Sequence, residues 1–181
     1  MEIQATPLSG VLLITPRVFG DDRGHFFESY NQRELEQKAG LRPAFVQDNQ
    51  SRSQCGVLRG LHYQNPSPQG KLVRVLEGEI FDVAVDLRRS SQTFRRWFGV
   101  KLSGANRQTL WIPEGFAHGF LVLSDYADVL YKTTDFYAPE HEHTLAWNDP
   151  DIGIEWPLSG APVLSAKDAA GTPFRNAELF A

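Results

Sequence analysis

The sequence predicts an all-β protein, a β-sandwich or β-barrel made of short strands. Of its 181 residues 12% are aromatic, and 15 Gly and 11 Pro are spread along the chain. Aromatic residues favour strands, whereas Gly and Pro favour the turns between them. Apolar runs recur at short spacing between these turn signals, and strands do not alternate with long helices. At this length we expect one domain over residues 1–181, with arms at its ends.

Short apolar or alternating segments predict the individual strands. The first is an apolar run at 11–15, followed by an aromatic-rich run at 25–30. The segment 80–87 alternates with the period of two that is typical of a strand, so that Asp82 and Asp86 share one side of it. That side either faces a pocket or forms a solvated outer face. The other expected strands are 59–64, 71–76, 97–102, 109–112, 119–123 and 128–134.

One segment, residues 31–39, is predicted to be a helix. Asn31 is a suitable N-cap, Glu34 follows in the capping-box position, and Gly40 is a typical C-terminal stop. Leu35 is its main apolar anchor, so the helix is expected on the surface between strands. The tail after Pro157 is rich in small residues and Pro, which is compatible with an ordered arm or a frayed end.

Composition excludes several classes of protein. The formal net charge is −4, which disfavours a general nucleic-acid surface. A single cysteine, Cys55, excludes an internal disulfide and a cysteine-rich zinc site. No run approaches the roughly 20 apolar residues of a membrane helix, and the first residues lack a signal-peptide pattern. We therefore expect a cytoplasmic protein with no membrane or nucleic-acid partner.

Two polar clusters contain the candidate chemistry. The run RGLHYQ at 59–64 puts His62 and Gln64 on one face of a strand, and PEGFAHG at 113–119 delivers His118 at the start of the next strand. These runs resemble the two motifs of the cupin family, which has a jelly-roll fold. In metal-binding cupins a second His and a Glu stand near the places of Gln64 and Lys71. Because Gln and Lys are poor ligands for transition metals, the resemblance implies a site with no metal and no cofactor.

Further runs make the resemblance closer. Besides the two clusters, the runs that occur in order are QDN at 47–49, KLVRV at 71–75, DVAVD at 82–86, NDP at 148–150 and LSAKD at 164–168. With these runs the chain resembles the dTDP-4-dehydrorhamnose 3,5-epimerase family over nearly its whole length. The resemblance implies an isomerase of dTDP-L-rhamnose biosynthesis that inverts C3 and C5 of dTDP-4-dehydro-6-deoxy-D-glucose.

The resemblance also implies roles for four catalytic residues. His62 is the expected base, because its ordinary pKa suits proton transfer near neutrality. Asp168 matches the carboxylate that partners this His and fixes its tautomer. Tyr131 matches the proton donor, and Lys71 would stabilise the oxygen of the developing enolate.

Further positions match substrate contacts of the family. A diphosphate calls for arginine forks, and Arg23 and Arg59 match the family's positions. The resemblance also implies a homodimer in which some contacts cross between subunits, with the N-terminal segment contributing. Phe26, Phe27 and Tyr137 are candidates for stacking on the thymine, but in a chain with 12 Phe core packing is the favoured interpretation for any one of them. The remaining matches to substrate contacts are Glu28, Gln47, Asp48, Asn49, His118, Glu142 and Lys167.

Three alternatives stay open at this point. A 3-only or 5-only epimerase would use the same His–Asp pair. A metal-dependent cupin, such as a dioxygenase or a phosphosugar isomerase, would need more ligands than His62 and His118. A non-catalytic sugar-binding cupin would need no acid and base on opposite sides of its pocket.

Overall fold

Short strands make up most of the computed structural model, which covers residues 1–181. The first half of the chain contains β1 (Glu2–Ala5), β2 (Leu12–Thr15), β3 (Val18–Asp21), β4 (Gly24–Phe27), α1 (Gln32–Ala39), β5 (Gln47–Gln54), β6 (Leu58–Gln64), β7 (Lys71–Glu77) and β8 (Glu79–Asp86). The second half contains β9 (Trp97–Ser103), β10 (Thr109–Ile112), β11 (Phe116–Val122), β12 (Tyr126–Thr133), the 3-10 helix η1 (Pro139–His141), β13 (Glu142–Thr144), α2 (Ala166–Ala169) and the 3-10 helix η2 (Phe174–Asn176).

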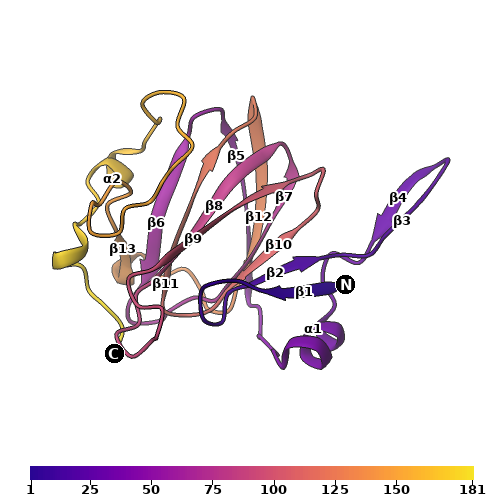
Figure 1. The fold of residues 1–181 in the computed structure, drawn as a ribbon, viewed down its shortest axis with the longest axis horizontal. Helices are drawn as coiled ribbons and strands as arrows, with labels where there is room; N and C mark the ends of the chain where they lie inside the picture. The colour runs from indigo at the N-terminus through magenta and orange to yellow at the C-terminus, as the bar shows by residue number, and fades with distance from the viewer.

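Two antiparallel sheets face each other as a sandwich (Figure 1). The larger sheet has the strand order β1-β2-β10-β7-β12-β5, and the smaller has the order β13-β6-β11-β8-β9. Strands β3 and β4 form a separate hairpin that projects from one end of the molecule. The predicted all-β, cupin-type class is confirmed. No helix is long and apolar enough to cross a membrane.

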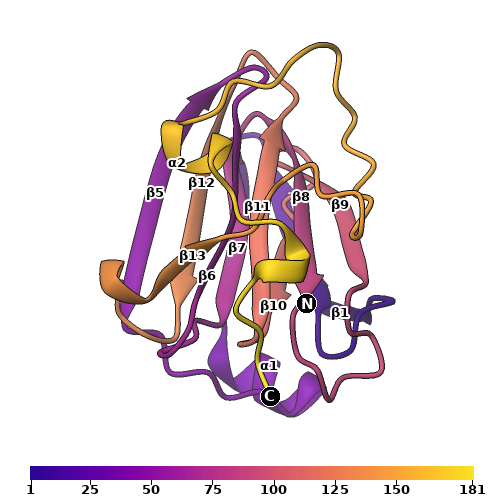
Figure 2. The same ribbon diagram turned by 90° about the vertical axis from the view of Figure 1, so that its left-hand side faces the viewer.

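The core has three layers, one between the sheets and one on the outer face of each. The central layer contains Val73 and Leu110 of the larger sheet with Ile80 and Phe120 of the smaller. Helix α1 covers the outer face of the larger sheet, where Leu35 packs with residues of β2, β7 and β10. The C-terminal arm covers the outer face of the smaller sheet, as Figure 2 shows. The tail is therefore an ordered arm.

The sequence could not decide whether the side of β8 that carries Asp82 and Asp86 faces a pocket or solvent, because both faces of this strand are buried. Val83 and Val85 point outward, but they are buried beneath the C-terminal arm. Asp82 and Asp86 lie on the opposite side, between the sheets, and neither is exposed to solvent. The interpretation of this side as a solvated outer face is therefore wrong, because both faces of this central strand are covered.

Helix α1 has the predicted N-cap and C-terminal stop, but the side chain of Glu34 pairs with Lys38 at 2.6 Å and does not close the capping box. The side chain of Asn31 accepts a hydrogen bond from the backbone N–H of Glu34 at 3.2 Å. Gly40 adopts the left-handed conformation, with φ of 67°, and its N–H donates to the carbonyl of Glu36. These are the two ways in which the free groups at helix ends are usually satisfied.

Other strands differ from the prediction. Strand β5 was not predicted, because its sequence QDNQSRSQ has no apolar face. It is a strand between a polar cavity and solvent, paired with β12. Strand β11 begins at Phe116, so His118 lies inside the strand and not at its start. The aromatic-rich run at 25–30 is a strand only up to Phe27, where its pairing with β3 ends.

Two glycines let β6 and β11 approach each other closely. The backbone of Gly60 has φ of 112°, and a Cβ there would lie 2.6 Å from the Cα of Gly119. A Cβ on Gly119 would lie 2.5 Å from the carbonyl oxygen of Arg59. The register between the strands shifts at this point, between His118 and Phe120. This close contact positions the segments that carry His62 and His118 beside each other.

Candidate active site

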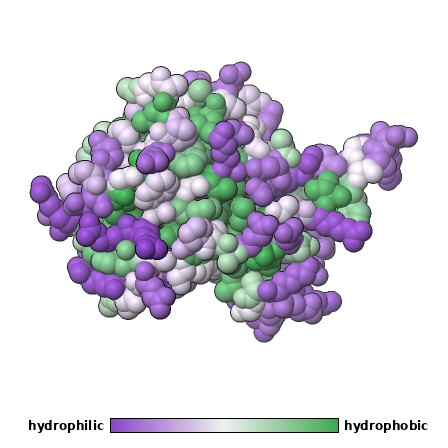
Figure 3. Space-filling view, in the orientation of Figure 1, coloured by the Kyte–Doolittle hydropathy of each residue, from purple (hydrophilic) through white to green (hydrophobic).

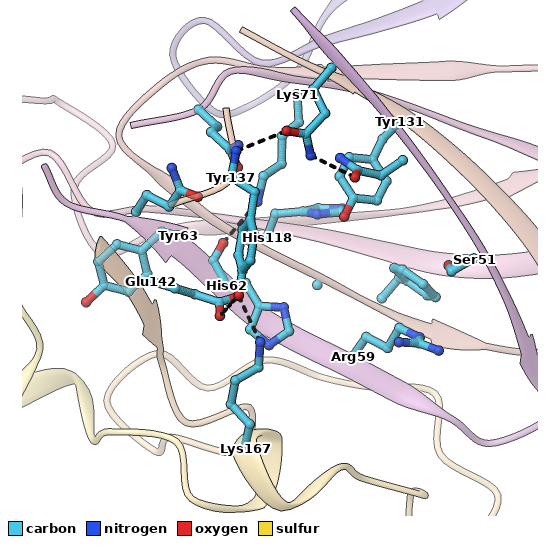
Figure 4. Close-up of a pocket in the computed structure, with 16 residues that line it drawn as sticks. Ser51, Arg59, His62, Tyr63, Lys71, His118, Tyr131, Tyr137, Glu142 and Lys167 are labelled. Atoms are coloured by element: carbon cyan, nitrogen blue, oxygen red, sulfur yellow. Dashed lines mark hydrogen bonds and ion pairs between the residues drawn. The ribbon is translucent and has the colours of Figure 1, made fainter. Parts of the chain in front are cut away.

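A polar cavity of about 340 Å³ lies between the two sheets (Figure 4). Its walls come from β5, β7 and β12 of the larger sheet and from β6, β11 and β13 of the smaller, with one residue from α2. The lining residues are Gln47, Asn49, Ser51, Arg59, His62, Tyr63, Gln64, Gln69, Lys71, His118, Gly119, Phe120, Tyr131, Tyr137, Glu142 and Lys167.

His62 forms a hydrogen-bonded pair with Asp168, although the two residues are 106 positions apart. The Nε2 of His62 lies 2.6 Å from Oδ1 of Asp168. The same carboxylate accepts from the backbone N–H of Gly60 at 3.2 Å and from the hydroxyl of Ser165 at 2.7 Å. Ser165 is also the N-cap of α2, and its side chain accepts a hydrogen bond from the backbone N–H of Asp168. This bond fixes the first turn of the helix, which carries Asp168. The aspartate is buried and rigidly placed behind the imidazole.

The surroundings favour a neutral imidazole beside an ionised carboxylate. Burial has the largest influence on His62 and lowers its pKa below 6.5, although the hydrogen bond with Asp168 acts in the opposite direction. Burial would raise the pKa of Asp168, but the hydrogen bonds from His62 and Ser165 outweigh it and lower that pKa to about 2. Near neutral pH, His62 can therefore accept a proton, and the adjacent carboxylate stabilises the resulting cation.

Lys71 lies inside the cavity as a buried cation. Its side chain enters from β7, and Nζ donates to the carbonyl oxygen of His62 at 3.2 Å. Burial lowers the pKa of Lys71 to about 8, while the charges of Asp82 and Glu142 favour its protonated form. Lys71 is therefore mostly protonated at pH 7 and can stabilise a negative oxygen, because charges interact more strongly in a buried site than in bulk water.

Tyr131 enters the cavity from the wall opposite His62. Tyr131 is on β12 of the larger sheet, whereas His62 is on β6 of the smaller. Burial raises the pKa of the Tyr131 phenol above its ordinary value of 10. Its hydroxyl therefore keeps its proton at neutral pH. A group bound between the sheets would have His62 on one side and Tyr131 on the other.

A second His–Asp pair lies deeper in the cavity wall. Nε2 of His118 is 2.8 Å from Oδ1 of Asp82, and both side chains are buried. The other oxygen of Asp82 is buried without a hydrogen-bond partner. Asp82 is linked to the cavity through His118, which lines it. Asp86 is on the same side of β8 but is the last residue of the strand. There its carboxylate accepts hydrogen bonds from Arg88, Ser91 and Thr93.

A chain of charged and polar groups crosses the mouth of the cavity. Lys167 donates to Oε1 of Glu142 at 2.8 Å, and the hydroxyl of Tyr137 donates to Oε2 at 2.9 Å (Figure 4). Burial would raise the pKa of Glu142, but these hydrogen bonds outweigh it and lower that pKa. On another wall, Gln47 donates to Asn49 at 2.9 Å. Arg59 donates to Ser53 at 2.9 Å.

Three of the sequence-predicted substrate contacts, Asp48, Arg23 and Glu28, and the stacking candidates Phe26 and Phe27 on β4 lie outside this cavity. Asp48 points to the other side of β5, where Lys132 donates to it at 2.9 Å, because side chains alternate along a strand. Arg23 is at the exposed tip of the β3–β4 hairpin, where it pairs with Asp21. Glu28 follows this hairpin and accepts from Asn31. Within one chain, the fold does not bring Arg23 or Glu28 to the cavity.

The cavity lacks a cluster of metal ligands. No three His, Cys, Asp or Glu side chains are arranged to hold a metal ion anywhere in the protein. Gln64 lines the cavity beside His62, but its amide bonds three main-chain groups. The absence of a metal in the reaction stays a prediction.

Several lining residues were not predicted from the sequence. Ser51 lines the cavity and its hydroxyl is buried without a partner. It was missed because the strand that carries it was missed; alternation from Gln47 and Asn49 would have found it. Tyr63 and Phe120 also line the cavity, and aromatic residues in such strands are hard to distinguish from core residues by sequence.

Comparisons with known proteins agree on one family. A family model described as dTDP-4-dehydrorhamnose 3,5-epimerase matches residues 5–176. The dTDP-4-dehydrorhamnose 3,5-epimerase of Pseudomonas aeruginosa is 60% identical over 180 residues, which cover 99% of each chain. The protein of the same name from Salmonella typhimurium is 57% identical over 171 residues, covering 94% of this chain and 93% of the relative.

A solved structure has the same fold. It is the crystal structure of dTDP-6-deoxy-D-glucose-3,5-epimerase from Legionella pneumophila in complex with dTDP-4-keto-L-rhamnose. The TM-score is 0.95 at 51% sequence identity, and the match covers 98% of this chain and 94% of that one. The similarity therefore extends over fold and sequence alike.

Proposed function

The chain belongs to the dTDP-4-dehydrorhamnose 3,5-epimerase family, and from this premise we propose how its cavity performs the reaction. The enzyme is an isomerase of dTDP-L-rhamnose biosynthesis. It converts dTDP-4-dehydro-6-deoxy-D-glucose to dTDP-4-dehydro-L-rhamnose by inverting C3 and C5. These carbons flank the 4-keto group, so their protons are weakly acidic and the ketone accepts the electrons.

His62 removes the proton. Its pKa is lowered by burial, so the ring is neutral at physiological pH. Nε2 is engaged with Asp168, which leaves Nδ1 as the nitrogen that takes the proton from C3 or C5. The electron pair of the broken C–H bond moves to the 4-keto oxygen and forms an enolate. Asp168 stabilises the imidazolium by remaining ionised.

Lys71 stabilises the enolate oxygen. A buried ammonium group is a strong electrostatic partner for charge that develops in the transition state. His118 lines the same cavity and is held by Asp82 through Nε2, which leaves its Nδ1 for a hydrogen bond with the sugar.

Tyr131 returns a proton to the carbon from the opposite face, and this inverts the configuration. One observation carries the proposal: His62 and Tyr131 lie on facing sheets, and Lys71 lines the same cavity. The imidazolium then loses its proton and the phenolate regains one by exchange with solvent. The same sequence at the second carbon completes the double epimerisation.

The nucleotide and diphosphate extend from the reacting sugar toward polar groups of the cavity. Arg59 is the arginine of the chain's own cavity that suits a phosphate oxygen. Gln47, Asn49, Glu142 and Lys167 provide further polar contacts.

Arg23 and Glu28 reach the substrate from a second subunit of a homodimer. The β3–β4 hairpin projects from the body (Figure 1). Its Phe19 and Phe26 are 49% and 67% exposed, and Figure 3 shows hydrophobic surface on the projecting part. Figure 3 also shows hydrophilic residues at its tip, where Arg23 lies. An apolar surface of this kind on a projecting hairpin is suited to packing against a second copy.

The test is NMR of dTDP-4-keto-6-deoxy-D-glucose incubated with the protein in deuterium oxide. Deuterium at both C3 and C5 is expected, since both protons pass through groups that exchange with solvent. Deuterium at one carbon only would assign a single epimerase. No deuterium at either would contradict the proposed reaction, and metal analysis of the pure protein would follow.

His62→Ala is the control variant. It should bind the nucleotide sugar but lose at least about a hundredfold in turnover, as expected for loss of a general base. Unchanged turnover would remove His62 as the base.

A further inference from the structure

Gln64 is a buried amide whose hydrogen bonds all go to the main chain. It ends β6, two residues after His62, and is 3% exposed. Its Nε2 donates to the carbonyl oxygens of Ser67 at 2.9 Å and Phe136 at 3.2 Å. Its Oε1 accepts from the N–H of Ala138 at 3.0 Å. A carboxylate cannot donate these bonds and an imidazole has too few polar atoms for all three.

Two more glutamines bind the same loop, residues 135–138, between β12 and η1. Gln69, just before β7, donates to the carbonyl oxygen of Asp135 at 2.8 Å. Gln47 on β5 accepts from the N–H of Tyr137 at 3.0 Å. Together with Gln64, these side chains hold a main-chain group of each of the four loop residues. We call Gln47, Gln64 and Gln69 the glutamine clamp.

The loop includes the cavity residue Tyr137, whose side chain is only partly packed against the rest of the protein. Tyr137 lines the cavity and is 52% exposed, and the neighbouring Phe136 is 63% exposed. Beyond its backbone, Tyr137 is held by the hydrogen bond from its hydroxyl to Glu142. The position of its ring therefore depends mainly on where the clamp holds the backbone.

We propose that Gln64 is a positioning residue that holds the 135–138 loop, and with it Tyr137, at the mouth of the cavity for substrate binding. This inference rests on the proposed function of the cavity. His62, Asp168 and Lys71 make no hydrogen bond to the loop, so a loosened loop weakens binding more than it slows the chemical steps. Gln64 thus occupies the place of a cupin metal ligand but serves to order a loop.

The test is Gln64→Met, which keeps the length of the side chain and removes its hydrogen bonds. We expect KM for the nucleotide sugar and Kd for dTDP to rise about tenfold, since several hydrogen bonds that order the loop are lost. Turnover should stay within about threefold of the wild type, because base and acid are untouched. Amide hydrogen exchange measured by mass spectrometry should become faster in peptides that cover 135–138.

Gln50→Met is the matched control. Gln50 is an exposed residue of β5, absent from the cavity lining, and its replacement should change none of these values. If Gln64→Met does not fold, Gln69→Met removes a single bond of the clamp and should give the same changes at smaller size.

Three results would overturn the proposal. Exchange in 135–138 equal to that of the wild type would show that Gln64 does not hold the loop. Faster exchange with unchanged KM and Kd would show that the loop does not govern binding. A large loss of turnover with unchanged KM would assign Gln64 to the chemistry of His62. If the wild type shows no epimerisation, the proposed function fails, while hydrogen exchange and dTDP binding still test the clamp.

Discussion

In the proposed reaction Tyr131 and His62 have separable roles, because Tyr131 returns a proton and His62 removes one. In Tyr131→Phe the base is intact, so His62 can still abstract a proton, exchange it with solvent and return it to the same face. We expect deuterium to enter C3 or C5 faster than the configuration inverts. NMR in deuterium oxide measures both rates in one sample.

The wild type and His62→Ala are the controls for that experiment. The wild type should couple exchange to inversion, and His62→Ala should show neither. Inversion at the wild-type rate in Tyr131→Phe would exclude the phenol as the proton donor.

The pH dependence follows from His62 and Lys71. Below the lowered pKa of His62, which is under 6.5, the base is protonated and kcat/KM falls. Above about pH 8, Lys71 loses its proton and its stabilisation of the enolate, so kcat/KM falls again. We expect a bell-shaped profile in steady-state assays across pH 5 to about 10.

Lys71→Arg identifies the alkaline limb. Arginine keeps its charge throughout this range, so the fall near pH 8 should disappear while the acid limb remains. The plateau should be lower than that of the wild type, because the guanidinium does not place its charge where the ammonium did. A fall near pH 8 that persists in Lys71→Arg would assign that limb to another group.

At the scale of elements, the contact between β6 and β11 is the feature on which the site depends. In Gly119→Ala the new Cβ would lie 2.5 Å from the carbonyl oxygen of Arg59, so the strands must separate. We expect a loss of about 1–3 kcal/mol in the free energy of unfolding, as for an overpacked core. Activity should fall as well, because the two strands carry His62 and His118. Urea unfolding and steady-state assays measure the two effects.

Gly160→Ala is the matched control for this contact. A Cβ on Gly160 meets nothing within 4 Å, so stability and activity should stay near those of the wild type. Wild-type stability in Gly119→Ala would mean that the close approach of β6 and β11 is not required.

Two elements also show how far local patterns predict structure. Helix α1 was predicted from its caps, and both caps are present, because capping is a local interaction. Strand β5 was missed, because a strand with a polar cavity on one side and solvent on the other has no apolar face to reveal it.

At the scale of the whole molecule, the proposed dimer makes a prediction that separates contacts within a chain from contacts across subunits. Arg23→Glu and His62→Ala should each be weak or inactive alone. When the two variants are unfolded and refolded together, half of the dimers are mixed. In each mixed dimer one cavity has His62 and receives an intact Arg23 from its partner. We expect about a quarter of wild-type activity.

No recovered activity in the mixture would contradict a contact of Arg23 across subunits. If Arg23 served the cavity of its own chain, every cavity in a mixed dimer would lack either Arg23 or His62. Size-exclusion chromatography of each variant confirms that failure to recover activity does not come from loss of the dimer.

The sequence by itself determined the class of fold and the kinds of functional side chain available to the site. Turn residues, aromatic strands and the caps of α1 are local signals, and they predicted an all-β protein with one short surface helix. The order of short runs predicted the family. It also selected His62, Lys71, Tyr131 and Asp168, which the resemblance singled out before their positions in space were known.

Only the tertiary structure decided which of these groups meet and which way each one faces. Asp168 lies behind His62 because α2 docks on β6, a contact between segments far apart in the chain. Asp82 faces the space between the sheets, where it pairs with His118, because the C-terminal arm covers the other side of β8. Asp48 faces solvent because its neighbours Gln47 and Asn49 line the cavity on the other face of β5. The physical reason is the same in each case: alternation along a strand gives two faces, and only long-range packing selects the one that lines the site.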